Sequence, residues 1–323
     1  GQAYRGTGRR GGHLMRFLVY SEDRELAFQI LAKARELADI KGSEVVALVT
    51  DGAPQDYINQ GADKAFNIEG LGSFALTPYR AAMLKAVDEA AADYILIGAT
   101  KRGKELAPRI AATLGVGCMN ECYSMRFEDD RLVVEKLTYG GSTVATEYSS
   151  RVPTVITVSP RSFEKLEAAE RSGEIIALDV DIPEPEVKVI EVREKPKSSS
   201  DVENADIIIS AGRGFKAKED LKILDKLAEI LGAAIGCTRP ISADLGWMDF
   251  WVGISGKKVK PSLYITCGIS GQIQHVAGIR DSKIIVSINN DESAGIHGVS
   301  DYSIVGDVYE VVPALVKVLK ERA

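Results

Sequence analysis

The sequence predicts an α/β protein made of two doubly wound domains, each with a mainly parallel sheet. Short apolar runs alternate with stretches of helical spacing from residue 15 onward, which is the pattern of βαβ units. The 323 residues, 45% of them hydrophobic, are enough for two cores at about 100–200 residues per domain. A Pro- and Ser-rich, charged stretch at 161–204 is typical of a linker. We therefore expect an N-terminal domain at 15–200 and a C-terminal domain at 201–323.

The N-terminal domain is predicted from hydrophobic periodicity and helix boundary residues. Gly42 is a stop signal for its first helix, and Thr77 and Pro78 suit an N-cap and a first helical residue. Residues 125–159 then become rich in β-forming residues, with Asp129 and Asp130 at a turn between two strands. The other expected elements are strands at 15–22, 43–50 and 93–100 and helices at 24–41, 77–92 and 103–115.

The C-terminal domain opens with a strand that enters a glycine-rich turn at 205–215, followed by a helical pattern at 218–236. Gly212, Gly214 and Ala217 fit the spacing G-x-G-x-x-A, which is equally typical of a tight strand-to-helix turn. The acidic residue that a dinucleotide fold needs about 20 residues later falls in no clear second strand. The motif alone therefore does not predict a dinucleotide-binding unit.

Composition excludes several classes of protein. The formal net charge is −6, so the basic surface that nucleic acid requires is not expected. No run approaches the roughly 20 apolar residues of a membrane span, so we expect no direct membrane insertion. The four cysteines form no C-x-x-C pair and have no neighbouring histidine, which argues against a zinc site and favours a reducing cytoplasmic compartment.

Residues 1–14 combine glycine and arginine without an acidic residue and are predicted to be an expression leader. This segment contains His13, one of three histidines. Only His275 and His297 are therefore expected to be available for imidazole chemistry.

The strongest candidate for a binding site is the loop-rich region at 237–291. A strand delivers Gly268, Ser270 and Gly271 to a helix start, where free N–H groups and the helix dipole favour an anion such as a phosphate. Asn289 and Asp307 follow neighbouring strands and could bind ribityl or ribose hydroxyls. Each also has a structural interpretation, with Asn289 as a turn former and Asp307 as a helix cap. His275 could likewise be a capping or core histidine.

The segment LYITCGISGQIQHVAGIRDSKIIVSIN resembles the signature of the electron transfer flavoprotein alpha subunit family. The likeness extends to SAGRGF, CTRP, VGISG and DYSIVGDVYEVVP in the second domain and to GATKRGKELAPRIAATLG and YGGSTVATEYSSRVPTVITV in the first. It covers nearly all of the chain from Met15. The resemblance implies a Rossmann-like C-terminal domain that holds FAD. It also implies an N-terminal domain like the adenine nucleotide alpha hydrolases, which serves as scaffold and as the contact to a beta subunit in a heterodimer.

The resemblance also implies roles for single residues. Small residues at the helix start would serve the pyrophosphate, Gln274 and His275 would reach the flavin, with His275 at a ring carbonyl, and Arg239 would lie over the ring as a positive group. The implied FAD contacts are Arg213, Thr238, Arg239, Val252, Gly253, Ile254, Ser255, Ser270, Gly271, Gln272, Ile273, Gln274, His275, Asn289, Asp307 and Val308.

The chain departs from the family pattern in three places. It has WVGISG, with Trp251, Ile254 and Ser255, where the family usually has QVGQTG, so we do not expect this loop to make the family's usual hydrogen bonds to the flavin. Asn290 replaces a usual lysine, and Thr238 replaces a usual serine but keeps the hydroxyl. His297 stands where an aromatic residue is common, and we expect a structural or surface role for it.

The function predicted from these observations is electron transfer rather than substrate turnover, because no nucleophile with a base, metal cluster or P-loop is found. The resemblance implies electrons from dehydrogenases that pass to a quinone reductase or another acceptor. One alternative is a bifurcating variant that oxidises NADH with a second flavin on the beta subunit. Alternatives of other classes are a stand-alone NAD-dependent oxidoreductase and a nucleotide-sensing module that uses the first domain.

Overall fold

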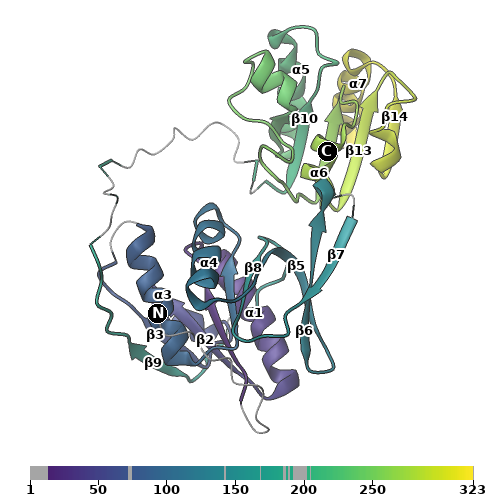
Figure 1. The fold of residues 1–323 in the computed structure, drawn as a ribbon. Coiled ribbons are helices and arrows are strands. Elements are labelled where there is room, and N and C mark those ends of the chain that lie inside the picture. Colours follow the sequence, from purple (N-terminus) through teal and green to yellow (C-terminus); the bar gives the residue numbers. More distant parts are fainter. Residues whose placement is uncertain are drawn as a thin grey trace. The chain divides into compact units, whose positions relative to one another are not determined.

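The chain forms two compact units, residues 1–192 and 193–323 (Figure 1). The predicted leader lies outside the described part except for Leu14. The computed structural model describes residues 14–71, 75–141, 143–167, 169–184, 187, 190–191, 202–203 and 205–322.

A sheet with the strand order β7-β6-β5-β8-β4-β1-β2-β3-β9 organises the described part of the N-terminal unit. In this spatial order, each pair of neighbouring strands between β5 and β9 is parallel. Strand β6 is antiparallel to both of its neighbours, β5 and β7. The strands are β1 (Arg16–Tyr20), β2 (Glu44–Val49), β3 (Lys64–Asn67), β4 (Tyr94–Gly98), β5 (Cys118–Glu128), β6 (Arg131–Thr138), β7 (Thr143–Tyr148), β8 (Thr154–Val158) and β9 (Glu174–Ala177).

Helices cover both faces of this sheet, which confirms the doubly wound prediction. Helices α1 (Arg24–Lys41) and α2 (Pro54–Asn59) bury their apolar residues in one core on one face. Helices α3 (Leu76–Ala90) and α4 (Lys101–Leu114) belong to a second core on the other face. A short 3-10 turn, η1 (Tyr139–Gly141), joins β6 to β7.

Most predicted boundaries of the N-terminal unit agree with the structure. Helix α1 ends at Lys41 and is capped by Gly42, whose φ of 60° suits glycine. The prediction that Thr77 is an N-cap is wrong, because α3 has Ala75 at this position and Thr77 lies inside the first turn. Strand β9 lies in the predicted linker and pairs with β3, since its sequence EIIA supplies apolar residues to the sheet edge.

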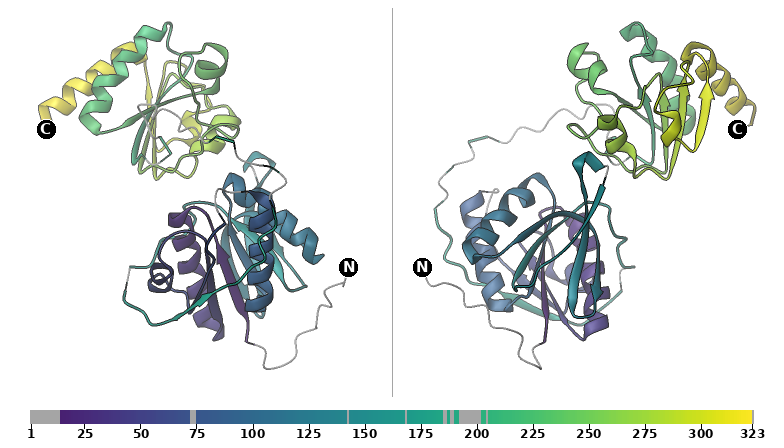
Figure 2. Two further views of the ribbon diagram at one scale, coloured as in Figure 1. Left: turned by 90° about the vertical axis from the view of Figure 1, so that its left-hand side faces the viewer. Right: turned by 45° about the vertical axis from the view of Figure 1, so that its right-hand side comes forward.

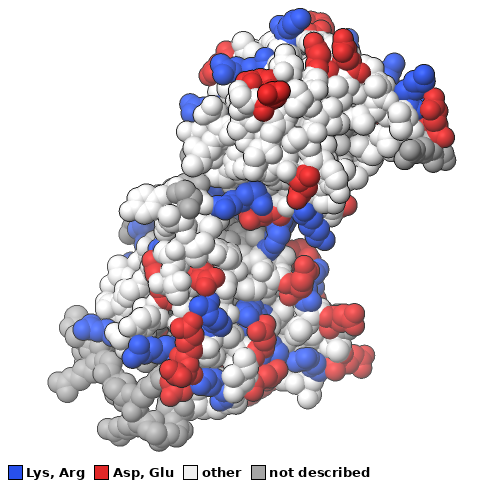
Figure 3. Space-filling model, turned by 90° about the vertical axis from the view of Figure 1, so that its right-hand side faces the viewer, with Lys and Arg blue, Asp and Glu red and all other residues white. Residues whose placement is uncertain are grey.

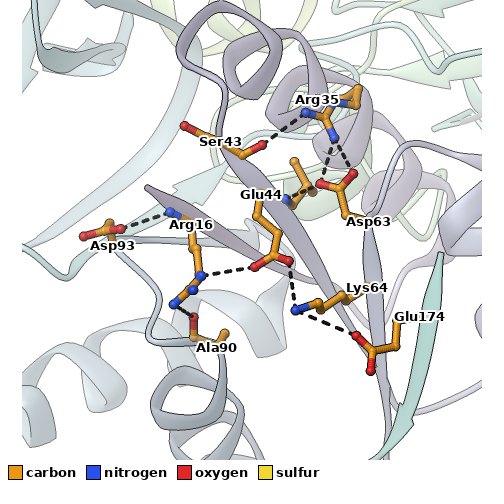
Figure 4. A network of polar contacts seen from close by, with 10 residues as sticks. Arg16, Arg35, Ser43, Glu44, Asp63, Lys64, Ala90, Asp93 and Glu174 are labelled. Atoms are coloured by element: carbon orange, nitrogen blue, oxygen red, sulfur yellow. Dashed lines mark hydrogen bonds and ion pairs between the residues drawn. The ribbon is translucent and has the colours of Figure 1, made fainter. Parts of the chain in front are cut away.

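Charged side chains connect the amino ends of the parallel strands (Figure 4). Glu44 at the start of β2 accepts a hydrogen bond from Arg16 at the start of β1 (3.1 Å) and pairs with Lys64 at the start of β3 (2.9 Å). Lys64 also lies 3.8 Å from Glu174 of β9, and the Arg16 N–H donates to Asp93 (3.0 Å). Doubly wound sheets bind ligands at the opposite, carboxyl edge, so we assign this network to strand alignment.

The C-terminal unit has a parallel sheet with the order β11-β10-β12-β13-β14. Helices α5 and α7 pack together on one face (Figure 2), and α6 covers the other face. Its elements are β10 (Ile207–Ala211), η2 (Lys218–Leu221), α5 (Lys222–Leu231), β11 (Ala234–Cys237), η3 (Pro240–Asp244), β12 (Leu263–Cys267), α6 (Ile273–Ile279), β13 (Ile284–Asn289), η4 (His297–Val299), β14 (Tyr302–Val305) and α7 (Val308–Arg322).

The second strand of the C-terminal unit is β11, which could not be recognised in the sequence. It has only four residues, including Gly236. The glycines of the preceding turn allow two loops to approach closely. A Cβ on Gly212 would lie 2.3 Å from the Gly268 carbonyl oxygen, and one on Gly214 would lie 2.7 Å from the Gly268 Cα. The motif therefore serves contact between the ends of β10 and β12.

The surface, the helices and the side-chain clusters can be compared with the classes that composition argues against, namely nucleic-acid-binding, membrane-spanning and zinc-binding proteins. On the face shown in Figure 3, Lys and Arg lie among Asp and Glu and form no continuous basic surface over the described residues. Within that same part of the chain, every helix is too short or too polar to cross a membrane. No cluster of three metal-ligating His, Cys, Asp or Glu side chains occurs there either.

Candidate cofactor site

A cavity of about 670 Å³ lies at the carboxyl ends of four neighbouring strands in the C-terminal unit. Gly212, Thr238 and Gly268 follow β10, β11 and β12, and Asn289 ends β13. Strand order changes direction at β10, between β11 and β12, and such a switch point is where doubly wound sheets bind ligands. The volume is that of a small-molecule or cofactor site.

Most residues that the sequence singled out line this cavity. Gly271 and Ile273 belong to the loop and helix at its edge without lining it, and Asp307 and Val308 also lie outside the lining. The predicted residues in the lining are Arg213, Thr238, Arg239, Val252, Gly253, Ile254, Ser255, Ser270, Gln272, Gln274, His275 and Asn289. Further lining residues, which the sequence did not single out as contacts, are Gly212, Gly214, Pro240, Asp244, Trp251, Gly268, Ile269, Asn290, Asp291 and Ala294.

Two arginines place positive charges in the lining of the cavity. Arg213 and Arg239 are exposed, and neither guanidinium has an ion pair or hydrogen bond with any residue in the described part of the chain. Five N–H donors on each planar group suit phosphate or another anionic acceptor. The side chains of Asp244 and Asp291 also line the cavity, so the positive charge is local rather than general.

The Thr238 hydroxyl has no hydrogen-bond partner among the described residues, although it is buried. Thr238 is 8% exposed and lines the cavity just beyond β11. An unpaired buried hydroxyl costs about 1–3 kcal/mol. A polar ligand in the cavity would supply the missing partner.

Backbone donors gather where the loop after β12 meets α6. The N–H groups of Gly271, Gln272, Ile273 and Gln274 have no partner among the described residues, as the first turn of a helix leaves its donors free. Gly271 has a φ of 82°, and a Cβ there would lie 2.2 Å from the Ile296 nitrogen. Only glycine fits this position.

A second glycine contact holds the loop between β11 and β12 against α6. A Cβ on Gly278 of α6 would lie 2.5 Å from the Cα of Gly253. The Ile254 N–H donates to the Gln274 carbonyl (2.8 Å). In the same loop the Trp251 indole N–H donates to the Ser255 hydroxyl (3.4 Å), so the departure from the family pattern forms an internal contact.

His275 is 6% exposed and contacts protein through both ring nitrogens. Its Nδ1 lies 2.9 Å from the Val252 carbonyl oxygen, which can only accept, so Nδ1 carries the proton and Nε2 is an acceptor. The Tyr264 hydroxyl is 3.4 Å from Nε2. Burial lowers the pKa of His275 to about 4, against the effect of the Val252 hydrogen bond, so the imidazole is neutral at pH 7.

Asn289, Asp307 and His297 each make the kind of local contact that their structural interpretation implies. The Asn289 amide donates to the Ile269 carbonyl (2.8 Å) and accepts from the Asp291 N–H (3.0 Å). Asp307 precedes α7 and accepts from the Tyr309 N–H (2.9 Å), as an N-cap does. His297 contacts the Ser287 hydroxyl (3.0 Å) and the carbonyl of Asp291 (3.2 Å).

The donor set fits an anionic cofactor with a polar chain. The unpaired arginines, the free N–H groups and the Thr238 hydroxyl supply donors, and glycines let a ligand approach the backbone.

Comparison with known families identifies the class of protein. Residues 201–280 match the family model described as the electron transfer flavoprotein FAD-binding domain, and residues 18–183 match the electron transfer flavoprotein domain. The C-terminal unit is thus an FAD-binding domain.

The chain belongs to the electron transfer flavoprotein alpha subunit family. It is 35% identical over 321 residues to the electron transfer flavoprotein subunit alpha of Thermoanaerobacterium thermosaccharolyticum, a match that covers 94% of this chain and 97% of that protein. It is 34% identical over 320 residues to Protein FixB of Clostridium saccharobutylicum, covering 94% and 96%. The resemblance inferred from the sequence, the two-domain α/β fold and the FAD cofactor are therefore confirmed.

Proposed function

We propose that this chain is the FAD-holding subunit of a heterodimeric electron carrier, paired with an electron transfer flavoprotein beta subunit. The cavity with two unpaired arginines and an unsatisfied Thr238 hydroxyl is the observation that carries the proposal. When bound, FAD accepts and releases electrons. Its donors would be dehydrogenases and its acceptor a quinone reductase or a similar protein, in a reducing cytoplasmic compartment.

Different residues of the cavity would bind different parts of FAD. The free N–H groups at Gly271 to Gln274 would bind the pyrophosphate, because they lie together and lack partners. The Thr238 hydroxyl would donate to the cofactor, and Arg239 would place a permanent positive charge beside the flavin ring. The neutral His275 would contribute a polar but uncharged edge.

Replacement of Thr238 by valine tests this assignment, because valine keeps the shape and removes the hydroxyl. We expect the flavin-free chain to keep or gain stability, as an unpaired buried hydroxyl is lost. FAD affinity should fall by about tenfold, which corresponds to one lost hydrogen bond of about 1.4 kcal/mol. Denaturant unfolding and FAD titration of the complex with the beta subunit measure the two effects. Unchanged FAD affinity would contradict the proposal, and Thr238→Ser, which keeps the hydroxyl, is the matched control.

A bifurcating carrier is the second candidate. The lactate dehydrogenase (NAD(+),ferredoxin) subunit LctC of Acetobacterium woodii is 33% identical to this chain over 309 residues, covering 91% of this chain and 73% of that protein. Anaerobic addition of NADH to the purified complex distinguishes the candidates. Bleaching of the flavin absorbance by NADH alone would favour bifurcation, and reduction only in the presence of a dehydrogenase and its substrate would favour the ordinary carrier.

A further inference from the structure

Trp251 is the only Phe, Tyr or Trp among the described residues that line the cofactor cavity. It is half-buried and packs against the core beneath α5 and α7, so protein covers one part of the indole and another part borders the cavity. The family usually has glutamine at this position. The indole is therefore a feature of this chain that the implied FAD contacts do not include.

The loop around Trp251 holds the indole in one orientation. The indole N–H donates to the Ser255 hydroxyl (3.4 Å), and the Trp251 carbonyl accepts from the Lys257 N–H (2.8 Å). A Cβ on Gly256 would lie 2.5 Å from Cδ1 and 2.6 Å from Nε1 of the indole, so the indole packs directly against the backbone there. A side chain that is ordered before a ligand binds loses little further conformational entropy on binding.

Backbone contacts place Trp251 beside the segment that carries Arg239. The Val252 N–H donates to the Cys237 carbonyl (2.8 Å), so the chain at Trp251 and Val252 runs alongside the end of β11. Arg239 follows shortly after Cys237 and also lines the cavity. The proposed pyrophosphate donors belong to the loop after β12 and to α6. Trp251 therefore lies on the β11 side of the cavity.

An aromatic side chain suits a planar ring system better than it suits a pyrophosphate or a ribityl chain. Aromatic rings gain from stacked or edge-to-face contact with one another beyond the burial of apolar area. FAD contains two such ring systems, the isoalloxazine and the adenine. The proposed function places Arg239 beside the isoalloxazine, and Trp251 borders the same side of the cavity.

Packing against the core does not by itself require an aromatic residue in the cavity wall. Trp247 packs against the same core and does not line the cavity. We propose that Trp251 contacts the isoalloxazine of bound FAD and forms an aromatic wall on the β11 side of the cavity. This inference rests on the proposed function, because that function places the flavin beside Arg239. The indole supplies apolar contact where the family usually has a polar side chain.

The experiment uses the two tryptophans of the chain, Trp247 and Trp251. The full chain is labelled with 5-fluorotryptophan and combined with unlabelled beta subunit. ¹⁹F NMR spectra are recorded without FAD, with saturating FAD and after anaerobic reduction of the bound FAD by dithionite. Either Trp247→Phe or Trp251→Phe assigns the two signals.

We expect the Trp251 signal to shift when FAD binds, because the ring current of the flavin acts on a side chain in contact with it. It should shift again on reduction, since reduction changes the isoalloxazine and leaves the adenine unaltered. The Trp247 signal is the internal control and should move far less in both steps. These shifts are measured in the unmodified chain, so they do not depend on the folding of a variant.

A second measurement is the affinity for FAD. Trp251→Ala should lower it by about tenfold, because an aromatic contact is lost, whereas Trp251→Phe should keep most of it. Trp247→Phe is the matched control and should leave the affinity unchanged. Circular dichroism shows whether each variant is folded.

Two results would overturn the contact with the isoalloxazine. One is a Trp251 signal that does not move when FAD binds, and the other is a shift on binding without a further shift on reduction, which would place the adenine against the indole. In both cases the complex would still hold FAD, and the proposed function would stand. A complex that binds no FAD would instead contradict the proposed function together with this contact.

Discussion

At the scale of single residues, the proposed place of Arg239 beside the flavin leads to a prediction about the reduction potential of bound FAD. Its guanidinium is exposed, lines the cavity and has no partner among the described residues. A cation beside the flavin stabilises the electron-rich state, so Arg239→Ala should lower the potential of bound FAD. We expect about 60 mV for one electron, which corresponds to the roughly 1.4 kcal/mol of a charged hydrogen bond.

Spectroelectrochemical titration of the complex measures this shift. Arg239→Lys should recover part of it, because the charge returns without the planar donor group. A potential that is the same in the Ala variant and the unmodified protein would show that Arg239 lies away from the flavin.

His275 makes the stability of the C-terminal unit depend on pH. Burial lowers its pKa from 6.5 to about 4, so between these values the unfolded chain binds a proton that the folded chain does not. The free energy of unfolding should therefore fall as pH decreases from about 6.5 to about 4, by about 3 kcal/mol at 1.36 kcal/mol per pKa unit. Urea unfolding at several pH values measures the slope. His275→Gln should flatten it in this range, and an equal slope in both proteins would contradict the assignment.

At the scale of elements, the sequence predicts what depends on periodicity and misses what depends on tertiary contacts. The apolar runs of β1, β2 and β4 and the helical spacing of α1 are visible in the sequence because each continues for several residues. Strands β3, β9 and β11 have four residues each, too few for a clear period, and only their neighbours in the sheet hold them.

The candidate site likewise has a part that the sequence predicts and a part that depends on tertiary contacts. The glycines and polar residues of 268–275 are a recognisable strand-to-helix loop, and most of them line the cavity. Asp244 and Trp251 come from the irregular segment between β11 and β12, where η3 is a single π-helical turn. No sequence period marks this segment, because its path depends on the contact between Gly253 and Gly278.

The loop before α6 allows a test of phosphate binding that leaves the fold intact. Gly271→Asp is unsuitable, because any Cβ at Gly271 would collide with the Ile296 backbone. Gln272 is exposed, has a φ of −60° and lines the cavity, so Gln272→Glu changes charge without strain. We expect FAD affinity to fall by about fivefold or more at low salt, since the carboxylate repels the pyrophosphate.

Isothermal titration at two salt concentrations checks this prediction, because screening should reduce the difference between the variants. Gln272→Met serves as an uncharged control of similar length. Equal affinities for the Glu and Met variants at low salt would place the pyrophosphate elsewhere in the cavity.

At the scale of the whole molecule, the two edges of the N-terminal sheet differ in a way that bears on the partner. The hairpin of β6 and β7 forms one edge, and β9 forms the other. Tyr139, Val144 and Tyr148 on this hairpin are 86%, 53% and 53% exposed. Exposed apolar side chains on an edge strand promote association, so we expect this edge to contact the beta subunit.

Val144→Lys tests this expectation in the complex. Loss of one buried valine costs about 1.5–3 kcal/mol, so the dissociation constant of the heterodimer should rise by about ten- to a hundredfold. Size-exclusion chromatography with light scattering should show a 1:1 heterodimer for the unmodified pair and free subunits for the variant at the same concentration. Ile175→Lys, at an exposed position (49%) on β9, is the matched control and should leave the heterodimer intact. If both variants remain heterodimeric with unchanged affinity, the hairpin edge is not the interface, whereas loss of the dimer only in Ile175→Lys would move the contact to the β9 edge.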